Sequence, residues 1–310
     1  DAIARQIQSH GMEVSGRTVR LYLQIMEGLG LVSHSGRGRG AGRTITESGL
    51  EEIEKARVLD RVGLTVTRVD TLAYQMDFDP VGRTGKIVLN LSFIEESQYQ
   101  RALAEMIPVF ESGWSMGKYL LVLREGQSCG PSRVPAGKIA IGTVCSVTLN
   151  GVLLRAGIPT LSKFGGVLEV HQGRPTRFTD VIYYDGTSLD PLEIFIKAGL
   201  TRVSQAVRTG DGRIGVSFRE VPTAALADVE RIQSQLQKIG LDGIVQIGKP
   251  NQPLIDFPVH EGRTGILVAA GLNPAAAVEE AGIPTRNSAL CTLYEFEKLV
   301  HYSEVGNSTE

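Results

Sequence analysis

Side chains suited to binding nucleic acid gather near the start of the chain. Residues 1–46 carry six arginines and three acidic residues, whereas the other 264 residues carry 26 basic and 31 acidic ones. A basic end on a mildly acidic body favours contact with a polyanion, because each arginine or lysine placed on a phosphate releases condensed counterions. The alternative interpretation is a solvated charge cluster that binds nothing. The secondary structure expected around the arginines distinguishes these two interpretations.

Two short helices are expected to position the first of these side chains. Apolar residues at helical spacing predict one helix before Gly11 and a second after Ser15, which is a suitable N-cap. The inner face of the second helix is expected to carry Val19, Tyr22, Leu23 and Met26. In a helix-turn-helix the second helix lies in the major groove, where Arg and Gln contact base edges. The residues predicted to contact DNA from this helix are Ser15, Arg17, Thr18, Arg20 and Gln24.

A hairpin with a basic tip follows these helices. Strand-like residues 31–34 and 43–46 flank a glycine-rich loop that contains Arg37 and Arg39, with Arg43 at its exit. Arginines on flexible arms and loops of DNA-binding domains insert into the minor groove or contact phosphates. We therefore predict that Arg37 and Arg39 enter the minor groove and that Arg43 holds a phosphate.

A further helix completes this region. It is expected from residue 47 to about residue 57, with Leu50 and Ile53 on its inner face. Helix, helix, hairpin and helix is the order of a winged-helix domain, which we place at residues 1–58. This region resembles the winged-helix module of archaeal regulators. Such a module normally begins with one more helix, so its first helix is expected to be missing from this sequence.

Three segments in the rest of the chain recur at a nearly constant spacing. Residues 137–141 and 156–160 are repeated 125 residues later, and residues 85–88 are repeated 127 residues later. Each copy has the pattern of a strand, a one-sided amphipathic helix, two more strands and a short helix. The fold class expected is therefore α/β (α+β), with an N-terminal winged helix-turn-helix followed by an internally duplicated α/β effector domain.

These patterns also predict the domain boundaries, and a chain of 310 residues suits two or three domains. The winged helix is placed at residues 1–58, a linker or entry strand at 59–84, and the duplicated regulatory domain at 85–310. Within the regulatory domain we expect half one at 85–160, a connecting insert without counterpart at 161–210, half two at 211–290, and a C-terminal element at 291–310.

Polar residues follow an apolar strand at corresponding places in the two halves. The candidate effector-binding residues are Cys145, Ser146, Thr148 and Asn150 in half one and Asn273 in half two. Both groups lie near the start of a helix, where free N–H groups and the helix dipole favour anions. Two facing halves would form a cleft that suits a ligand with a carboxylate at either end. The alternative interpretation is that the polar residues only cap their helices and that Cys145 is a small buried apolar residue.

Patterns typical of catalysis or metal binding are missing from the sequence. The five histidines show no HExxH spacing, the three cysteines show no CxxC spacing, and no Gly-x-Ser-x-Gly occurs. We therefore expect no enzymatic activity, no metal and no cofactor. The alternative is an enzyme or metabolite-binding protein in which His171 or His260 acts as a general base in the cleft and the winged helix serves protein contacts.

Composition is that of an ordinary globular protein. Hydrophobic residues make up 42% of the chain and charged residues 21%, with a mean hydropathy of 0.00. No apolar run approaches the roughly 18 residues that a membrane helix needs, and the first ten residues lack the layout of a secretion signal. We therefore expect a cytoplasmic protein with no membrane partner.

Five longer segments carry a family resemblance. They are residues 142–151, 155–159, 164–169, 186–196 and 217–222. These segments resemble the regulatory domain of NrpR, an archaeal family of transcriptional repressors of nitrogen-assimilation genes. The resemblance implies a DNA-binding domain followed by an effector-sensing domain, a homodimer on a palindromic operator of double-stranded DNA, and release from DNA when the effector 2-oxoglutarate accumulates. It also allows a co-regulator of the same family as a partner.

Overall fold

The computed structural model describes residues 2–9, 14–35, 42–56 and 64–305. The chain divides into two compact units, Asp1–Arg61 and Val62–Glu310. Within the described ranges, no helix is both long enough and apolar enough to cross a bilayer.

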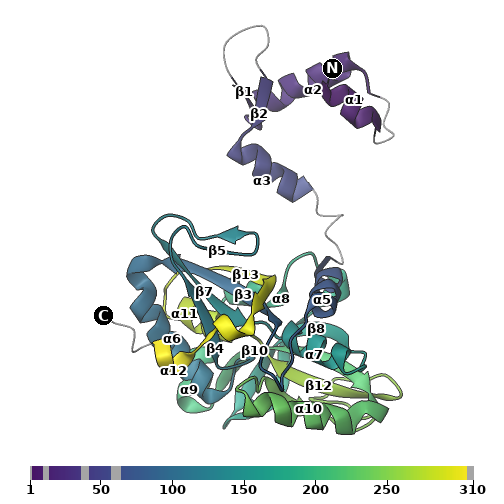
Figure 1. Ribbon diagram of the computed structural model, residues 1–310, viewed down its shortest axis with the longest axis vertical. Coiled ribbons are helices and arrows are strands. Elements are labelled where there is room, and N and C mark those ends of the chain that lie inside the picture. The colour runs from purple at the N-terminus through teal and green to yellow at the C-terminus, as the bar shows by residue number, and fades with distance from the viewer. Residues whose placement is uncertain (1, 10–13, 36–41, 57–63, 306–310) are drawn as a thin grey trace. The chain divides into compact units, whose positions relative to one another are not determined.

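The first unit has the predicted order of helix, helix, hairpin and helix (Figure 1). Its elements are α1 (Ala2–Ser9), α2 (Gly16–Gly28), β1 (Val32–Ser35), β2 (Gly42–Ile45) and α3 (Glu47–Ala56). The two strands pair antiparallel, with Val32 opposite Ile45. Ser15 caps α2 as expected, because its hydroxyl accepts the Thr18 N–H at 3.1 Å. The local sequence signals of this unit therefore produce the elements that they predict.

The inner faces expected for α2 and α3 are only partly buried. Val19 is 8% exposed, but Tyr22 is 57% exposed and Leu50 is 56% exposed, and Met26 and Ile53 are exposed as well. The prediction that these four residues face a core was wrong. Helical spacing places apolar residues on one face, but burial needs a neighbouring surface, and the described elements of this unit supply too little to cover both helices.

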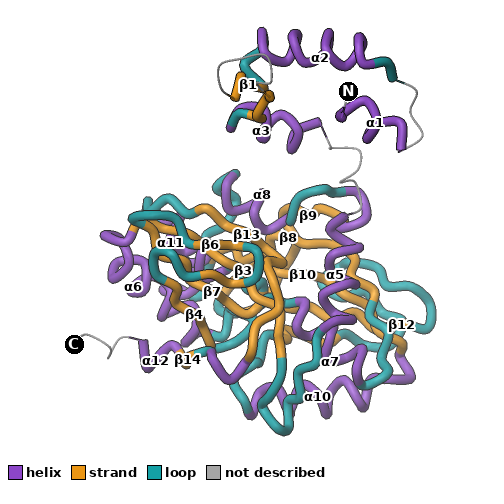
Figure 2. The backbone as a smooth tube through the Cα atoms, turned by 45° about the horizontal axis from the view of Figure 1, so that its top comes forward, coloured by secondary structure: helices purple, strands orange, loops and turns teal. Residues whose placement is uncertain are grey.

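The second unit is built on two five-stranded antiparallel sheets with helices packed beside them (Figure 2). One sheet has the order β13-β3-β7-β4-β14, made of Arg286–Glu295, Lys86–Glu95, Lys138–Val144, Tyr119–Leu123 and Val300–His301. The other has the order β11-β12-β10-β8-β9, made of Ile244–Ile247, Arg263–Ala269, Gly212–Pro222, Leu161–His171 and Arg174–Tyr183. Two further strands, β5 (Ser128–Cys129) and β6 (Ser132–Arg133), pair antiparallel as a short hairpin.

The helices of this unit pack around the two sheets. They are α5 (Leu64–Gln75), α6 (Tyr99–Ser112), α7 (Val147–Arg155), α8 (Pro191–Lys197), α9 (Val203–Thr209), α10 (Leu226–Lys238), α11 (Asn273–Glu280) and α12 (Tyr302–Val305). The predicted amphipathic helices are α6 and α10, each of which buries an apolar stripe. The α+β fold class and the internal duplication are both present.

The two halves exchange one strand each, which the sequence analysis did not predict. Strand β8 follows half one but pairs with β10 of half two, and β13 follows half two but pairs with β3 of half one. Their first residues, Leu161 and Arg286, are 125 positions apart, the spacing of the duplication. Residues 161–171 therefore have a counterpart, and the boundary that began an insert without counterpart at residue 161 was wrong. The C-terminal boundary at residue 291 was also wrong, because it divides β13.

The predicted linker or entry strand at residues 59–84 was wrong over residues 64–75, which form helix α5. Val69, Ala73 and Met76 are buried against the second unit and recur at helical spacing. Gly151 of α7 allows this contact, because a Cβ atom there would lie 2.4 Å from the Met76 Cε. Helix α5 is therefore part of the second unit and not a connection between units.

Candidate effector-binding site

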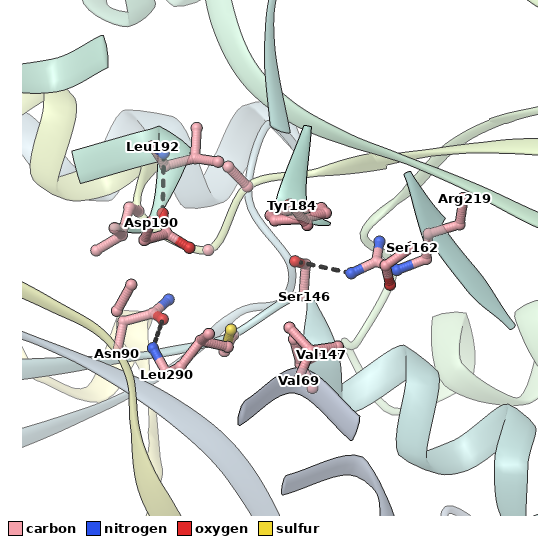
Figure 3. A pocket seen from close by; sticks show the side chains of 15 residues that line it. Val69, Asn90, Ser146, Val147, Ser162, Tyr184, Asp190, Leu192, Arg219 and Leu290 are labelled. Atoms are coloured by element: carbon pink, nitrogen blue, oxygen red, sulfur yellow. Dashed lines mark hydrogen bonds between the residues drawn. The ribbon is translucent and has the colours of Figure 1, made fainter. Parts of the chain in front are cut away.

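A small cavity lies where the two halves of the second unit meet (Figure 3). Its walls include residues 145–147 at the start of α7 and residues 270–272 before α11, two segments that are related by the 125-residue spacing. The cavity has a volume of about 20 Å³. That space holds about one water molecule, so a larger ligand requires the walls to move.

The most unusual residue in the cavity wall is Arg219 of β10, which is 1% exposed. Its guanidinium donates to the Ser146 hydroxyl (3.0 Å), the Ser217 hydroxyl (2.8 Å) and the Asn150 side-chain oxygen Oδ1 (2.5 Å). Burial lowers the pKa of this group. All three acceptors are neutral, and none of the described carboxylates lies within ion-pair distance of Arg219. A buried charge without a counter-charge is costly, so this wall favours an anion.

An acidic group forms another part of the wall. Asp190 caps α8 by accepting the Leu192 N–H at 2.8 Å (Figure 3). Burial raises the pKa of the Asp190 carboxyl to about 7, with a further contribution from the nearby Glu193 carboxylate, while Arg68 acts in the opposite direction. The cavity therefore combines a cationic wall with a carboxyl group that is partly protonated near neutral pH.

Of the five predicted effector residues, two line the cavity, namely Cys145 and Ser146. Ser146 connects the start of α7 to Arg219. Burial raises the pKa of the Cys145 thiol to about 11, and Cys145 is 5% exposed. This environment fits the alternative interpretation of Cys145 as a small buried residue rather than a reactive thiol.

Thr148 and Asn273 do not line the cavity and instead hold their helices to strands β3 and β10. The Thr148 hydroxyl accepts the Val88 N–H (3.2 Å) and lies 3.3 Å from the Val88 carbonyl. The Asn273 side chain bonds both the N–H and the carbonyl of Gly215 at 2.8 Å, and it also donates to the Trp114 carbonyl at 2.8 Å. Val88 and Gly215 are 127 positions apart, so the two contacts are equivalent. The same contact in both halves indicates a structural role.

Asn150 lies behind the cavity wall. Its side-chain oxygen accepts a hydrogen bond from Arg219, and its side-chain nitrogen donates to the Ser162 hydroxyl at 2.9 Å. It therefore orients Arg219 rather than facing the cavity.

The predicted DNA-contacting residues of α2 differ in their surroundings. Arg17, Arg20 and Gln24 are exposed at spacings of three and four residues, as one helical face requires. Ser15 and Thr18 bond one another at 2.8 Å in the helix cap. Their contact with DNA stays a prediction.

The wing arginines divide into two cases. Arg37 and Arg39 lie outside the described residues. Arg43 forms an ion pair with Glu27 of α2, with 3.0 Å between Nη2 and Oε2, and its side chain is 22% exposed. This ion pair joins the hairpin to α2 and competes with the predicted phosphate contact.

The chain is similar to known proteins over most of its length. Residues 62–301 match the family described as NrpR regulatory domains NRD1 and 2. The chain belongs to the NrpR family. Residues 1–53 match the winged-helix domain of ribonuclease R, which supports the winged helix expected for the first unit.

Named relatives of this NrpR chain are nitrogen regulators. The global nitrogen regulator NrpRI of Methanosarcina mazei is 31% identical over 298 residues, covering 96% of this chain and 91% of that protein. NrpR of Methanococcus maripaludis is 28% identical, and the alignment covers 96% of this chain but 51% of that protein. A solved nitrogen repressor-like protein from Methanococcus jannaschii matches with a TM-score of 0.65 and 26% identity, covering 77% of this chain and 98% of that one. The chain is therefore a nitrogen-related regulator of the repressor family and not an enzyme.

The catalytic alternative for this NrpR chain placed a histidine in the cleft. His260 instead contacts the buried Glu220 carboxylate at 2.7 Å, and His171 contacts Asp211 at 2.8 Å. Neither histidine lines the cavity, so that placement was wrong. In the described part of the chain, no three His, Cys, Asp or Glu side chains come together as metal ligands.

Arg219, Asp190 and Tyr184 are cavity residues that the sequence analysis did not select. A signal for Arg219 was present, because a charged residue within the apolar strand 214–221 must be buried or must interrupt the strand. Asp190 and Arg219 also lie in segments that carry the NrpR resemblance. Their meeting in one cavity depends on the strand exchange and could not be read from spacing.

Proposed function

We propose that this chain represses nitrogen-assimilation genes by binding operator DNA, and that 2-oxoglutarate bound in the cavity between the two halves releases it. The observation that carries the effector proposal is Arg219, a buried guanidinium that bonds three neutral oxygens beside the start of α7. A carboxylate entering the cavity would supply the missing counter-charge. The N-terminus of α7 adds N–H groups that favour the same charge.

The shape of the site suits one effector per chain. The start of α11 is closed by the Asn273 side chain and by Gly271, where a Cβ atom would lie 2.0 Å from the Val144 carbonyl oxygen. The start of α7 carries Ser146 and faces Arg219. We therefore replace the expectation of two equivalent helix ends, one for each carboxylate, with a single cationic anchor and Asp190 on another wall.

The DNA-binding part of the proposal rests on the first unit. Exposed Arg17, Arg20 and Gln24 on one face of α2 would read base edges, and Arg37 and Arg39 would reach the minor groove. A homodimer would place two recognition helices on half-sites of a palindrome about 34–36 Å apart. A second regulator of the same family is a further proposed partner.

Selection of duplexes from a random pool, followed by fluorescence anisotropy of the tightest duplex, tests the DNA-binding part. We expect Arg20→Ala to relax sequence preference, with a loss of about 1–3 kcal/mol on that duplex, and Arg37→Ala to weaken all duplexes alike and reduce the salt dependence. Equal binding of the wild-type chain to selected and random duplexes would refute the repressor proposal.

Calorimetry with 2-oxoglutarate tests the effector part. We expect one binding event per chain and a lower affinity for the selected duplex when 2-oxoglutarate is present. Glutarate, which lacks the keto group, and glutamate, which carries a cation in its place, serve as matched ligands. Absence of heat together with unchanged duplex binding would refute 2-oxoglutarate as the effector.

A further inference from the structure

Helix α5 is both a wall of the cavity and the first described element of the second unit. Val69 of α5 lines the cavity and is 3% exposed. The helix begins at Leu64, three residues beyond Arg61, where the DNA-binding unit ends. The segment that leaves the first unit therefore leads directly into an element that touches the proposed effector site.

Two contacts hold α5 to segments that adjoin the cavity wall. The buried Thr65 hydroxyl donates to the Thr187 carbonyl at 3.3 Å, and the Leu189 carbonyl lies 3.5 Å from the same oxygen. Arg68 donates to the Cys291 carbonyl at 3.3 Å. Thr187 lies three residues before Asp190, Leu189 lies next to Asp190, and Cys291 follows Leu290. Each contact therefore reaches a segment that carries a cavity residue.

The walls of the cavity differ in how easily they can move. Asn90 and Arg219 lie on β3 and β10, each of which is hydrogen-bonded to a strand on both sides. Val69 lies on a helix that is held by side-chain contacts and apolar packing. Because the cavity has room for about one water, a dicarboxylate must displace a wall, and the helix costs less to displace than the centre of a sheet.

We propose that α5 transmits effector binding to the DNA-binding unit. An anionic effector anchored at Arg219 displaces Val69, and with it the start of α5, to which the first unit is joined. Thr65 is the positioning residue, because it ties the start of α5 to the segment before Asp190 and makes the two move together. This inference rests on the proposed function, since it assumes that the cavity holds the effector.

A substitution at Thr65 tests the coupling apart from binding. Thr65→Val removes the hydroxyl but keeps the shape, and Thr71→Val is the matched control at an exposed position of the same helix. We expect Thr65→Val to keep a 2-oxoglutarate Kd within about threefold of the wild type, by calorimetry, while the effector-induced loss of duplex affinity falls at least threefold. Thr65→Ser should restore the response. A full response in Thr65→Val, equal to that of Thr71→Val, would overturn the proposal.

A second variant needs no effector. Val69→Phe overfills the cavity and should lower duplex affinity at least threefold without ligand, whereas Leu72→Phe, on the same helix but outside the cavity wall, should not. If the wild type ignores 2-oxoglutarate but Val69→Phe weakens duplex binding, the effector is wrong and the coupling stands. Thermal unfolding checks that Val69→Phe is folded. If the wild type responds to 2-oxoglutarate and the folded Val69→Phe variant binds the duplex as tightly as the wild type, the coupling is wrong.

Discussion

The starts of helices α7 and α11 occupy equivalent places in the duplicated unit, yet they differ in chemistry. Both are attached to the first strand of their half by a side chain, Thr148 to β3 in one and Asn273 to β10 in the other. Two residues earlier the equivalence ends, with Ser146 beside α7 and Gly271 beside α11. Ser146 at the α7 end accepts a hydrogen bond from the buried Arg219 guanidinium, whereas Asn273 at the α11 end bonds backbone groups.

This difference shows that the two halves share a scaffold but contribute different side chains to the cavity between them. Position 219 carries the arginine, and the residue 127 positions earlier is Ser92, whose hydroxyl donates to Asn287 at 2.7 Å. Gly271 packs against the Val144 carbonyl and the Asn90 amide, so no side chain fits there. The two similar halves therefore form one cavity between them, and its two sides carry different side chains.

The largest expected effect separates Arg219 from its counterpart. Arg219→Met removes the cation and should weaken 2-oxoglutarate binding by about 2–5 kcal/mol, the cost of losing one partner of a buried charge pair. Ser92→Ala should leave the affinity within about threefold of the wild type. Calorimetry on both variants measures the contrast, and an equal loss in the two would mean that the halves share the effector.

The next effect concerns the two attachment residues. Asn273→Ala should lower the free energy of unfolding by about 1–3 kcal/mol, because it removes the acceptor of the buried Gly215 N–H, while the Gly215 carbonyl still accepts the Ala270 N–H. Thr148→Val should lower it by about 1–2 kcal/mol. Urea denaturation measures both. Effector affinity of the folded variants should stay within about threefold. A loss of affinity without loss of stability would return these residues to the ligand-contacting set.

The buried Asp190 carboxyl should make the free energy of unfolding of the chain depend on pH. Because the pKa of Asp190 is raised to about 7 in the folded chain, the folded state keeps a proton that the unfolded state releases near pH 4. The free energy of unfolding of the wild type should therefore fall as pH rises from about 4 to about 7 and level off above that, by about 4 kcal/mol relative to Asp190→Asn. Urea denaturation of both chains between pH 4 and pH 8 measures this difference. Parallel curves for the two chains would contradict the raised pKa.

The smallest effect is expected at Cys145, whose counterpart in the other half is Ala270. Cys145→Ala should change the free energy of unfolding by about 1 kcal/mol or less and effector affinity by less than threefold, since it removes one small buried group. Because the pKa of the thiol is raised to about 11, iodoacetamide at pH 8 should modify it slowly in the folded chain. Mass spectrometry reads the modification, and rapid labelling would indicate an exposed thiolate.

Local patterns predicted most elements of this chain. The cap at Ser15 and the hairpin after the second helix lie where the sequence places them. The errors concern burial and partners: Tyr22 and Leu50 have the spacing of core residues but are exposed, and residues 64–75 were assigned to a linker although Val69, Ala73 and Met76 have helical spacing.

The sequence by itself determined the order of the elements, the duplication and the basic first unit, because capping, periodicity and charge are properties of neighbouring residues. Tertiary structure alone decided that β8 and β13 are exchanged between the halves and that Arg219, Ser146 and Asp190 meet in one cavity. The physical reason is that side chains show which faces of a strand are buried, whereas the backbone N–H and C=O groups that pair strands are the same in every strand and do not specify the partner. The binding site is formed by that choice of neighbours.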